Sequence, residues 1–182
     1  MSTEYKILFT GTMGAGKTTA IATVSEIPPL VTDVRNSDAS IAKAETTVGL
    51  DFGQISLDGG HRVRLFGTPG QVRFDFLWKI LVRNALGLII LADNSRPDPL
   101  ADLTTYLDGF AEELDRVPCA IGVGRMEGHP SPDIDAYADR LAAKGRMFPV
   151  IPVDVRRRDD VLLLIDTLLA QIEAGLMDEL PR

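Results

Sequence analysis

The fold of this chain is decided by Gly11-Thr12-Met13-Gly14-Ala15-Gly16-Lys17-Thr18, which matches the pattern G-x-x-x-x-G-K-[ST]. The stretch follows an apolar run over residues 5–10 that predicts a buried strand, and precedes residues 19–24, whose apolar spacing predicts a helix. Glycines let a loop wrap around an anion, so that its N–H groups and the helix N-terminus point at that anion. The stretch therefore predicts a phosphate site, although a glycine-rich turn with an incidental lysine would share the same letters.

Each residue of the stretch has an expected part in phosphate binding. Lys17 supplies a point charge to the β- and γ-phosphates of a nucleotide, and the Thr18 hydroxyl ligates Mg²⁺. The residues that we expect to contact the phosphates are Gly11, Thr12, Met13, Gly14, Ala15, Gly16, Lys17, Thr18 and Thr19.

Length and composition are those of one ordinary globular domain spanning residues 1–182. The chain is 45% hydrophobic and 25% charged, and its net charge of −7 argues against a surface for nucleic acid or anionic membranes. The single cysteine, Cys119, excludes an intrachain disulfide and fits a reducing cytoplasm. The sequence offers no run of 18 uncharged apolar residues and no terminal lipidation signal, so we expect no direct membrane anchor.

The alternation of short apolar runs with longer amphipathic ones predicts a layered α/β fold with a six-stranded, mostly parallel sheet. Residues 47–57 and 61–66 flank Asp58-Gly59-Gly60, which predicts a hairpin and one antiparallel edge strand. Residues 30–46 are polar and lack periodicity, so we expect a long loop there. The prolines within residues 148–153 place the last strand at a sheet edge.

Four further motifs follow the phosphate loop. They are Thr47-Val48-Gly49-Leu50-Asp51-Phe52, Gly67-Thr68-Pro69-Gly70-Gln71, Gly124-Arg125-Met126-Glu127, and residues 153–160 with Asp154-Val155 at their start. Their order resembles that of the Ras-like small GTPases over nearly the whole chain. The resemblance is closest to the prokaryotic MglA-type and conservon-type branches of that superfamily.

The resemblance assigns roles in sensing the terminal phosphate. Thr47 would complete the Mg²⁺ coordination, with its neighbour Thr46 as an alternative, although two threonines also suit the start of a strand. Gly70 would bring its N–H close to the γ-phosphate, and Gln71 would orient an attacking water. Catalysis would thus depend on Gln71 and Lys17, with Thr18 and Thr47 as metal ligands.

Three motifs depart from the family pattern. Gly67 replaces the aspartate that normally holds a Mg²⁺-bound water, so Mg²⁺ affinity should fall without vanishing, and the MglA-type branch shares this loss. In the base-binding motif, Glu127 could accept from guanine and the Arg125 stem could cover the base, whereas Gly124 offers no side chain to tie the loop to the phosphate loop.

The last motif is also altered. Backbone groups of Asp154 and Val155 could contact the base edge, or the segment could be a solvated turn with acidic residues at a helix N-terminus. Guanine is the leading base, and adenine or a loosely selected purine remains an alternative.

The sequence thus predicts a Mg²⁺-dependent switch that binds GTP and GDP and hydrolyses GTP slowly. Arg35 and Arg73 are candidates for a catalytic arginine supplied by the chain itself. The alternatives are an ATP-binding P-loop enzyme and a binding module that reports nucleotide state without hydrolysis. The resemblance further implies a roadblock-type protein as activator or effector.

Overall fold

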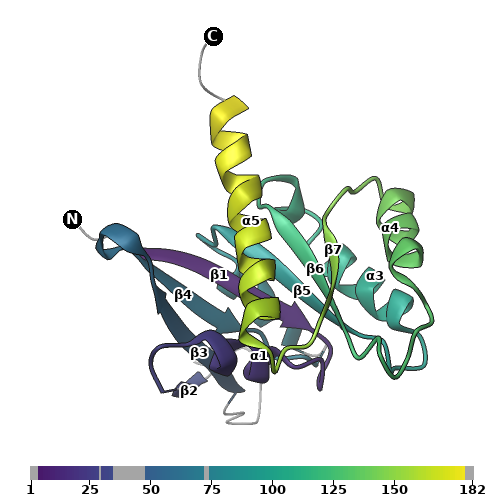
Figure 1. Ribbon diagram of the computed structural model, residues 1–182, viewed down its shortest axis with the longest axis horizontal. Coiled ribbons are helices and arrows are strands. Elements are labelled where there is room, and N and C mark those ends of the chain that lie inside the picture. The colour runs from purple at the N-terminus through teal and green to yellow at the C-terminus, as the bar shows by residue number, and fades with distance from the viewer. Residues whose placement is uncertain (1–3, 29, 35–47, 72–73, 179–182) are drawn as a thin grey trace.

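A seven-stranded sheet in the order β2-β3-β4-β1-β5-β6-β7 runs through the structure, a computed structural model that describes residues 4–28, 30–34, 48–71 and 74–178 (Figure 1). The strands are β1 (Glu4–Gly11), β2 (Leu30–Val34), β3 (Val48–Ser56), β4 (Arg62–Gly67), β5 (Gly87–Asp93), β6 (Cys119–Gly124) and β7 (Val150–Val153). The helices are α1 (Lys17–Val24), α2 (Asp75–Leu81), α3 (Pro99–Gly109), α4 (Ile134–Ala143) and α5 (Arg158–Asp178), with single 3-10 turns η1 (Asp58–Gly60) and η3 (Glu113–Asp115).

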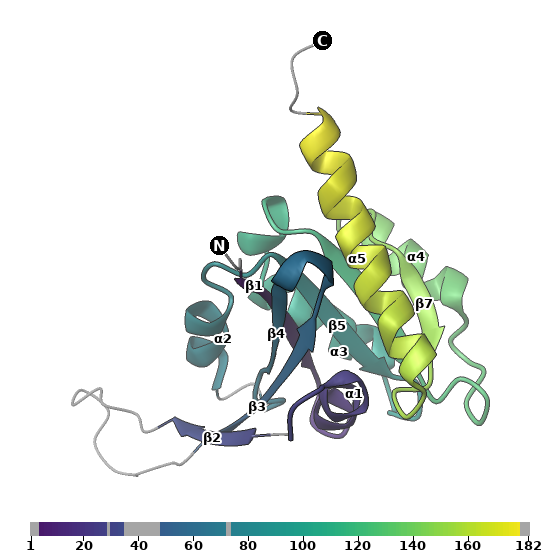
Figure 2. The ribbon, with the colours of Figure 1, turned by 60° about the vertical axis from the view of Figure 1, so that its left-hand side comes forward.

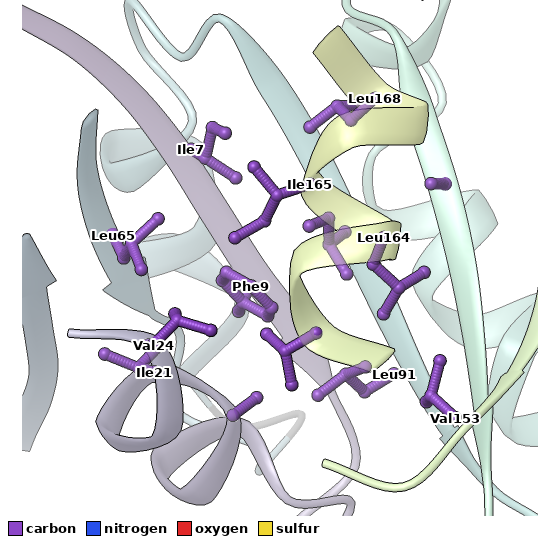
Figure 3. Packing of buried hydrophobic residues seen from close by; sticks show 14 of the residues in the cluster. Ile7, Phe9, Ile21, Val24, Leu65, Leu91, Val153, Leu164, Ile165 and Leu168 are labelled. Carbon is purple, nitrogen blue, oxygen red and sulfur yellow. The ribbon is translucent and has the colours of Figure 1, made fainter. Parts of the chain in front are cut away.

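Helices cover both faces of the sheet because the buried strands are apolar on both sides. In β1, Ile7 and Phe9 point to the face that α1 and α5 cover, whereas Leu8 points to the opposite face. Figure 3 shows Ile21 of α1 and Leu164 of α5 packed with Phe9 on the first face. On the second face, α2, α3 and α4 contribute a cluster of large aromatic side chains, which includes Trp78, Tyr106, Phe110 and Tyr137.

Parallel pairing places the candidate motifs at one edge of the sheet. Strands β4, β1, β5, β6 and β7 pair in parallel, so their carboxyl ends lie along the same edge. The segments that follow these strands begin at residues 12, 68, 94, 125 and 154. In open α/β sheets this edge is where ligands bind.

The structure confirms the layered α/β class, the hairpin and the position of the last strand, β7, at an edge of the sheet. The sheet has seven strands, one more than we expected. Residues 30–34, expected to be loop, form β2, which pairs antiparallel with β3 (Figure 2). The antiparallel strand β3 therefore lies second from the edge. The strand forms through backbone pairing of residues 30–34 with β3, a contact between distant segments that the local sequence pattern does not reveal.

The helix that follows Gln71 is short, since α2 covers only residues 75–81. The longest helix, α5, extends beyond the sheet (Figure 1). Within the residues that the structure describes, no helix has both the length and the apolar character needed to cross a membrane.

Candidate functional site

A pocket of about 910 Å³ lies at the carboxyl edge of the sheet. It brings together residues that the sequence spreads over more than 140 positions. The sequence candidates that line it are Met13, Gly14, Ala15, Gly16, Lys17, Thr18, Thr19, Gly70, Gly124, Arg125, Glu127, Asp154 and Val155.

Three of the described candidates are not among the lining residues. Gly11 and Thr12 belong to the same loop without being part of the pocket lining, and Gln71 directly follows the lining residue Gly70. Thr47 falls outside the described residues, as do Thr46, Arg35 and Arg73. The expected roles of these four in metal coordination or catalysis stay predictions.

The loop between β1 and α1 has the geometry of an anion site. Gly14 and Gly16 have φ angles of 83° and 96°, which glycine adopts without strain. The buried Lys17 ammonium donates to the carbonyls of Gly11 and Thr12, at 2.7 and 2.8 Å. Burial lowers the pKa of Lys17 to about 8, and the nearby Asp51 carboxylate partly opposes that shift. A phosphate at this loop would supply the negative charge that favours the ammonium form.

Asp51 is a site residue that we did not expect from the sequence. The Thr18 hydroxyl donates to Asp51 Oδ2 at 2.7 Å. A Cβ on Gly67 would lie only 2.9 Å from that same oxygen and 3.0 Å from the Asp51 Cβ. The Asp51 carboxylate thus occupies the space that a side chain at position 67 would enter. The family pattern has an aspartate at the position of Gly67. In this chain the Asp51 carboxylate, from the neighbouring strand β3, lies in that space.

The sequence did contain a signal for this replacement. In the hairpin, Leu57 N–H donates to the His61 carbonyl beside the Asp58–Gly60 turn, and counting outward from that pair sets Asp51 opposite Gly67. Two residues directly opposite in a sheet have neighbouring side-chain positions. The turn was recognised, but its register was not extended to the glycine.

The segment after β4 lies against the phosphate loop. Thr68 N–H donates to the Phe9 carbonyl at 2.8 Å, and the Thr68 hydroxyl is 2.8 Å from that of Thr10, which continues the pairing of β1 with β4. The Gln71 amide Nε2 is 3.6 Å from the sulfur of Met13, whose side chain is 66% exposed. The amide of Gln71, the expected catalytic residue, thus forms a weak hydrogen bond with Met13 of the phosphate loop.

Arg125 corrects our view of the base-binding segment. We expected nothing to tie this segment to the phosphate loop because Gly124 has no side chain. The Arg125 guanidinium instead donates to the Gly14 carbonyl at 2.9 Å, to the Ser95 hydroxyl at 3.1 Å and to the Asp93 carboxylate. Arg125 has a φ of 65°, a conformation that non-glycine residues rarely adopt outside sites that need it.

A buried asparagine holds the rest of this segment. The Asn94 amide donates to the carbonyls of His129 and Pro132, at 2.5 and 2.9 Å. Tyr137 OH donates to the Asn94 carbonyl oxygen at 2.7 Å. The hydrogen bonds of Asn94 therefore fix the segment that carries Glu127, while the Glu127 side chain itself is exposed.

The segment after β7 has the acidic helix start of our second interpretation, and the base contact of the first stays a prediction. Arg156 donates to both carboxylate oxygens of Asp154, which lowers the pKa of Asp154 to about 2. Asp154 N–H donates to Asp160 at the start of α5, so this amide is already engaged. The acidic first turn of α5 is confirmed. Of the two backbone amides expected at a base edge, Val155 is the better placed to serve.

Comparisons with known proteins agree with this architecture. No protein-family model matches the chain. It is 21% identical over 93% of its length to ADP-ribosylation factor-like protein 3 of Saccharomyces cerevisiae, covering 86% of that protein. It is 27% identical over 72% of its length to Ras-related protein Rab-8A of Gallus gallus, about half of which (52%) it spans.

A solved structure shares the fold. The G domain of the T. maritima FeoB iron transporter superposes with a TM-score of 0.66 at 15% identity, covering 92% of this chain and 98% of that one. The two sequence similarities support placing the chain in the Ras-like P-loop GTPase superfamily, and the solved structure shows the shared fold. They do not distinguish the branch within it.

The Arg125–Asp93 pair can be tested by a double-mutant cycle. The Asp93 side chain is only 5% exposed, so Arg125→Met leaves a buried carboxylate with the Ser95 donors alone. We expect the free energy of unfolding in urea to fall by about 1–3 kcal/mol. In an Asp93→Asn background the same substitution should cost less, because no buried charge is left. Equal costs in both backgrounds would contradict the pairing.

Proposed function

We propose that this chain is a guanine-nucleotide-binding switch of the Ras-like superfamily, formed by one domain over residues 1–182, which requires Mg²⁺ and hydrolyses GTP slowly. The observation that carries the proposal is that one pocket combines the phosphate loop, the Gly70 segment and the Glu127 segment. These are the three parts needed to hold a nucleotide's phosphates, sense the terminal one and recognise a base. The similarity to an ADP-ribosylation factor-like protein and a Rab-related protein supports the same function.

Guanine is the proposed base. The Glu127 carboxylate can accept from the N1–H and N2–H₂ donors of guanine, which adenine lacks, and the Val155 amide can donate to O6. Arg125 is held over the phosphate loop through Gly14, so its stem can cover one face of the base.

One observation at Gly124 supports the alternative that the site binds purine nucleotides with little selectivity. A Cβ on Gly124 would meet only backbone oxygens, those of Ala92 and Val153, at 3.6 and 3.8 Å. A base therefore meets no side-chain donor or acceptor from position 124. Since discrimination depends on polar groups that the wrong base leaves unpaired, binding of ATP is the alternative.

Mg²⁺ fits the residues beside the phosphate loop. The Thr18 hydroxyl and the Asp51 carboxylate are hard oxygen donors of the kind that Mg²⁺ prefers, and they lie 2.7 Å apart. We propose that Thr18 ligates the ion and that Asp51 holds one of its waters, with Thr47 as a further ligand. Bound Mg²⁺ would neutralise charge on the β- and γ-phosphates.

The contact of Gln71 with Met13 supports the proposal of slow hydrolysis. Its amide contacts the Met13 sulfur, so the side chain has to leave Met13 before it can orient an attacking water. This contact is also the observation that favours a binding module without hydrolysis. The cytoplasmic location, the MglA-type or conservon-type branch and a roadblock-type partner belong to the same proposal, and rest on the sequence alone.

Nucleotide competition tests the choice of base. We expect GTP and GDP to displace a fluorescent guanine nucleotide at least tenfold better than ATP or XTP, because only guanine offers two donors to Glu127. Lys17→Ala should abolish tight binding, whereas Lys144→Ala, at the end of α4 and paired with Asp108, should leave it unchanged. ATP binding as tightly as GTP would refute the guanine assignment, and retained affinity in Lys17→Ala would refute the phosphate site.

Single-turnover hydrolysis separates the enzyme from the binding module. With Mg²⁺ and GTP we expect a slow reaction in the wild type that Gln71→Leu reduces at least tenfold, because an oriented water is lost. Gln54→Leu, on β3 outside the pocket, is the matched control. No detectable hydrolysis in the wild type, with or without a roadblock-type protein, would favour the binding module.

The role of Asp51 is tested by moving the carboxylate. Asp51→Asn should raise the Mg²⁺ concentration that half-maximally slows GDP release by about tenfold or more, because a group that orients a metal-bound water is lost. Adding Gly67→Asp in an Asp51→Gly background, where no side chain at position 51 fills the space, should recover part of the affinity because the new carboxylate enters that space. Asp108→Asn, on α3, is the control. An unchanged Mg²⁺ dependence in Asp51→Asn would remove Asp51 from the metal site.

A further inference from the structure

Two buried aromatic side chains hold consecutive carbonyls beside the phosphate loop. Trp78 Nε1 donates to the Pro69 carbonyl at 3.0 Å, and Tyr106 OH donates to the Gly70 carbonyl at 3.0 Å. The two side chains are 1% and 2% exposed, respectively. A buried donor without a partner is costly, so each of these bonds is strongly favoured over none.

Aromatic stacking holds the Trp78 and Tyr106 side chains in place. The Trp78 ring, from α2, stacks on that of Tyr106, from α3, with centroids 4.7 Å apart. It also stacks on Phe110, which is fully buried, at 5.5 Å. Burial raises the pKa of Tyr106, so its hydroxyl stays a neutral donor. Packing on this scale fixes both donors, because neither ring can turn without opening the aromatic cluster of the α2–α3 face.

The held carbonyls determine where the amides point. In a planar trans peptide, the N–H of the next residue lies opposite the C=O. With the carbonyls of Pro69 and Gly70 turned to Trp78 and Tyr106, the N–H groups of Gly70 and Gln71 are turned away from the aromatic cluster.

The phosphate loop lies directly beside this segment. A Cβ on Gly70 would be 2.5 Å from the Met13 amide nitrogen and 2.8 Å from Lys17 Nζ. Both of these atoms are donors that suit an anion. Gly70 therefore lies so close to the phosphate loop that a side chain at this position would not fit.

We propose that Trp78 and Tyr106 are positioning residues for the terminal phosphate of the nucleotide. By holding two carbonyls they keep the amides of Gly70 and Gln71 preset as donors, so that a triphosphate gains contacts that a diphosphate does not make. The inference rests on the proposed function. The new element is that the hydrogen bonds from α2 and α3 to the Pro69 and Gly70 carbonyls determine how much more tightly the triphosphate binds than the diphosphate.

Conservative substitutions test the inference through a ratio of affinities. Tyr106→Phe removes one oxygen and keeps the stacked ring, and Trp78→Phe removes the indole N–H. For each variant, the dissociation constants of GTPγS and of GDP are measured by competition with Mg²⁺, together with the thermal midpoint. We expect the preference for GTPγS over GDP to fall about tenfold, the effect of one lost hydrogen bond, while GDP affinity changes less than twofold.

Tyr5→Phe is the matched control. It removes a hydroxyl from the start of β1, at the opposite end of that strand from the phosphate loop, and should leave the ratio unchanged. If Trp78→Phe does not fold, Tyr106→Phe decides alone. An unchanged ratio in Tyr106→Phe, or equal loss of GTPγS and GDP affinity, would overturn the inference. A wild type that binds neither nucleotide would instead overturn the proposed function.

Discussion

Parallel pairing of β1 with both β4 and β5 is the constraint on which the rest of the structure depends. It aligns the carboxyl ends of these strands, so that every segment leaving them emerges at one edge. The apolar alternation of β1, with Ile7 and Phe9 on one face and Leu8 on the other, commits both faces to helices. Only the edge is left for a polar site, and the pocket lies there.

Two departures from the family pattern are compensated by side chains from neighbouring positions. The carboxylate missing at Gly67 comes from Asp51 on the paired strand, and the link missing at Gly124 comes from the guanidinium of Arg125. At Gly67 the missing side chain leaves the space that the Asp51 carboxylate fills. A departure at one motif position therefore does not by itself mean that the corresponding chemistry has been lost. The lower Mg²⁺ affinity that we expected from Gly67 stays a prediction, whereas the hydrogen bond from Arg125 to Gly14 does connect the Glu127 segment to the phosphate loop.

The phosphate loop, the α/β class and the hairpin could be predicted because each depends on residues close together in the sequence. Glycine spacing, apolar period and the Asp58–Gly60 turn are local properties. The strand β2 could not be predicted, since it depends on backbone pairing with β3, which lies farther along the chain. The bond of Trp78 to the Pro69 carbonyl could not be predicted either, because it depends on how α2 lies against the preceding loop.

The sequence by itself determined that a phosphate loop stands between the first strand and the first helix, and in what order the other motifs follow. The tertiary structure decided which groups meet at that loop: Asp51 with Thr18, Arg125 with Gly14, and Tyr106 with Gly70. The physical reason is reach. A hydrogen bond forms only within about 3 Å, and residues 33, 111 or 36 positions apart come that close only through strand register and helix packing.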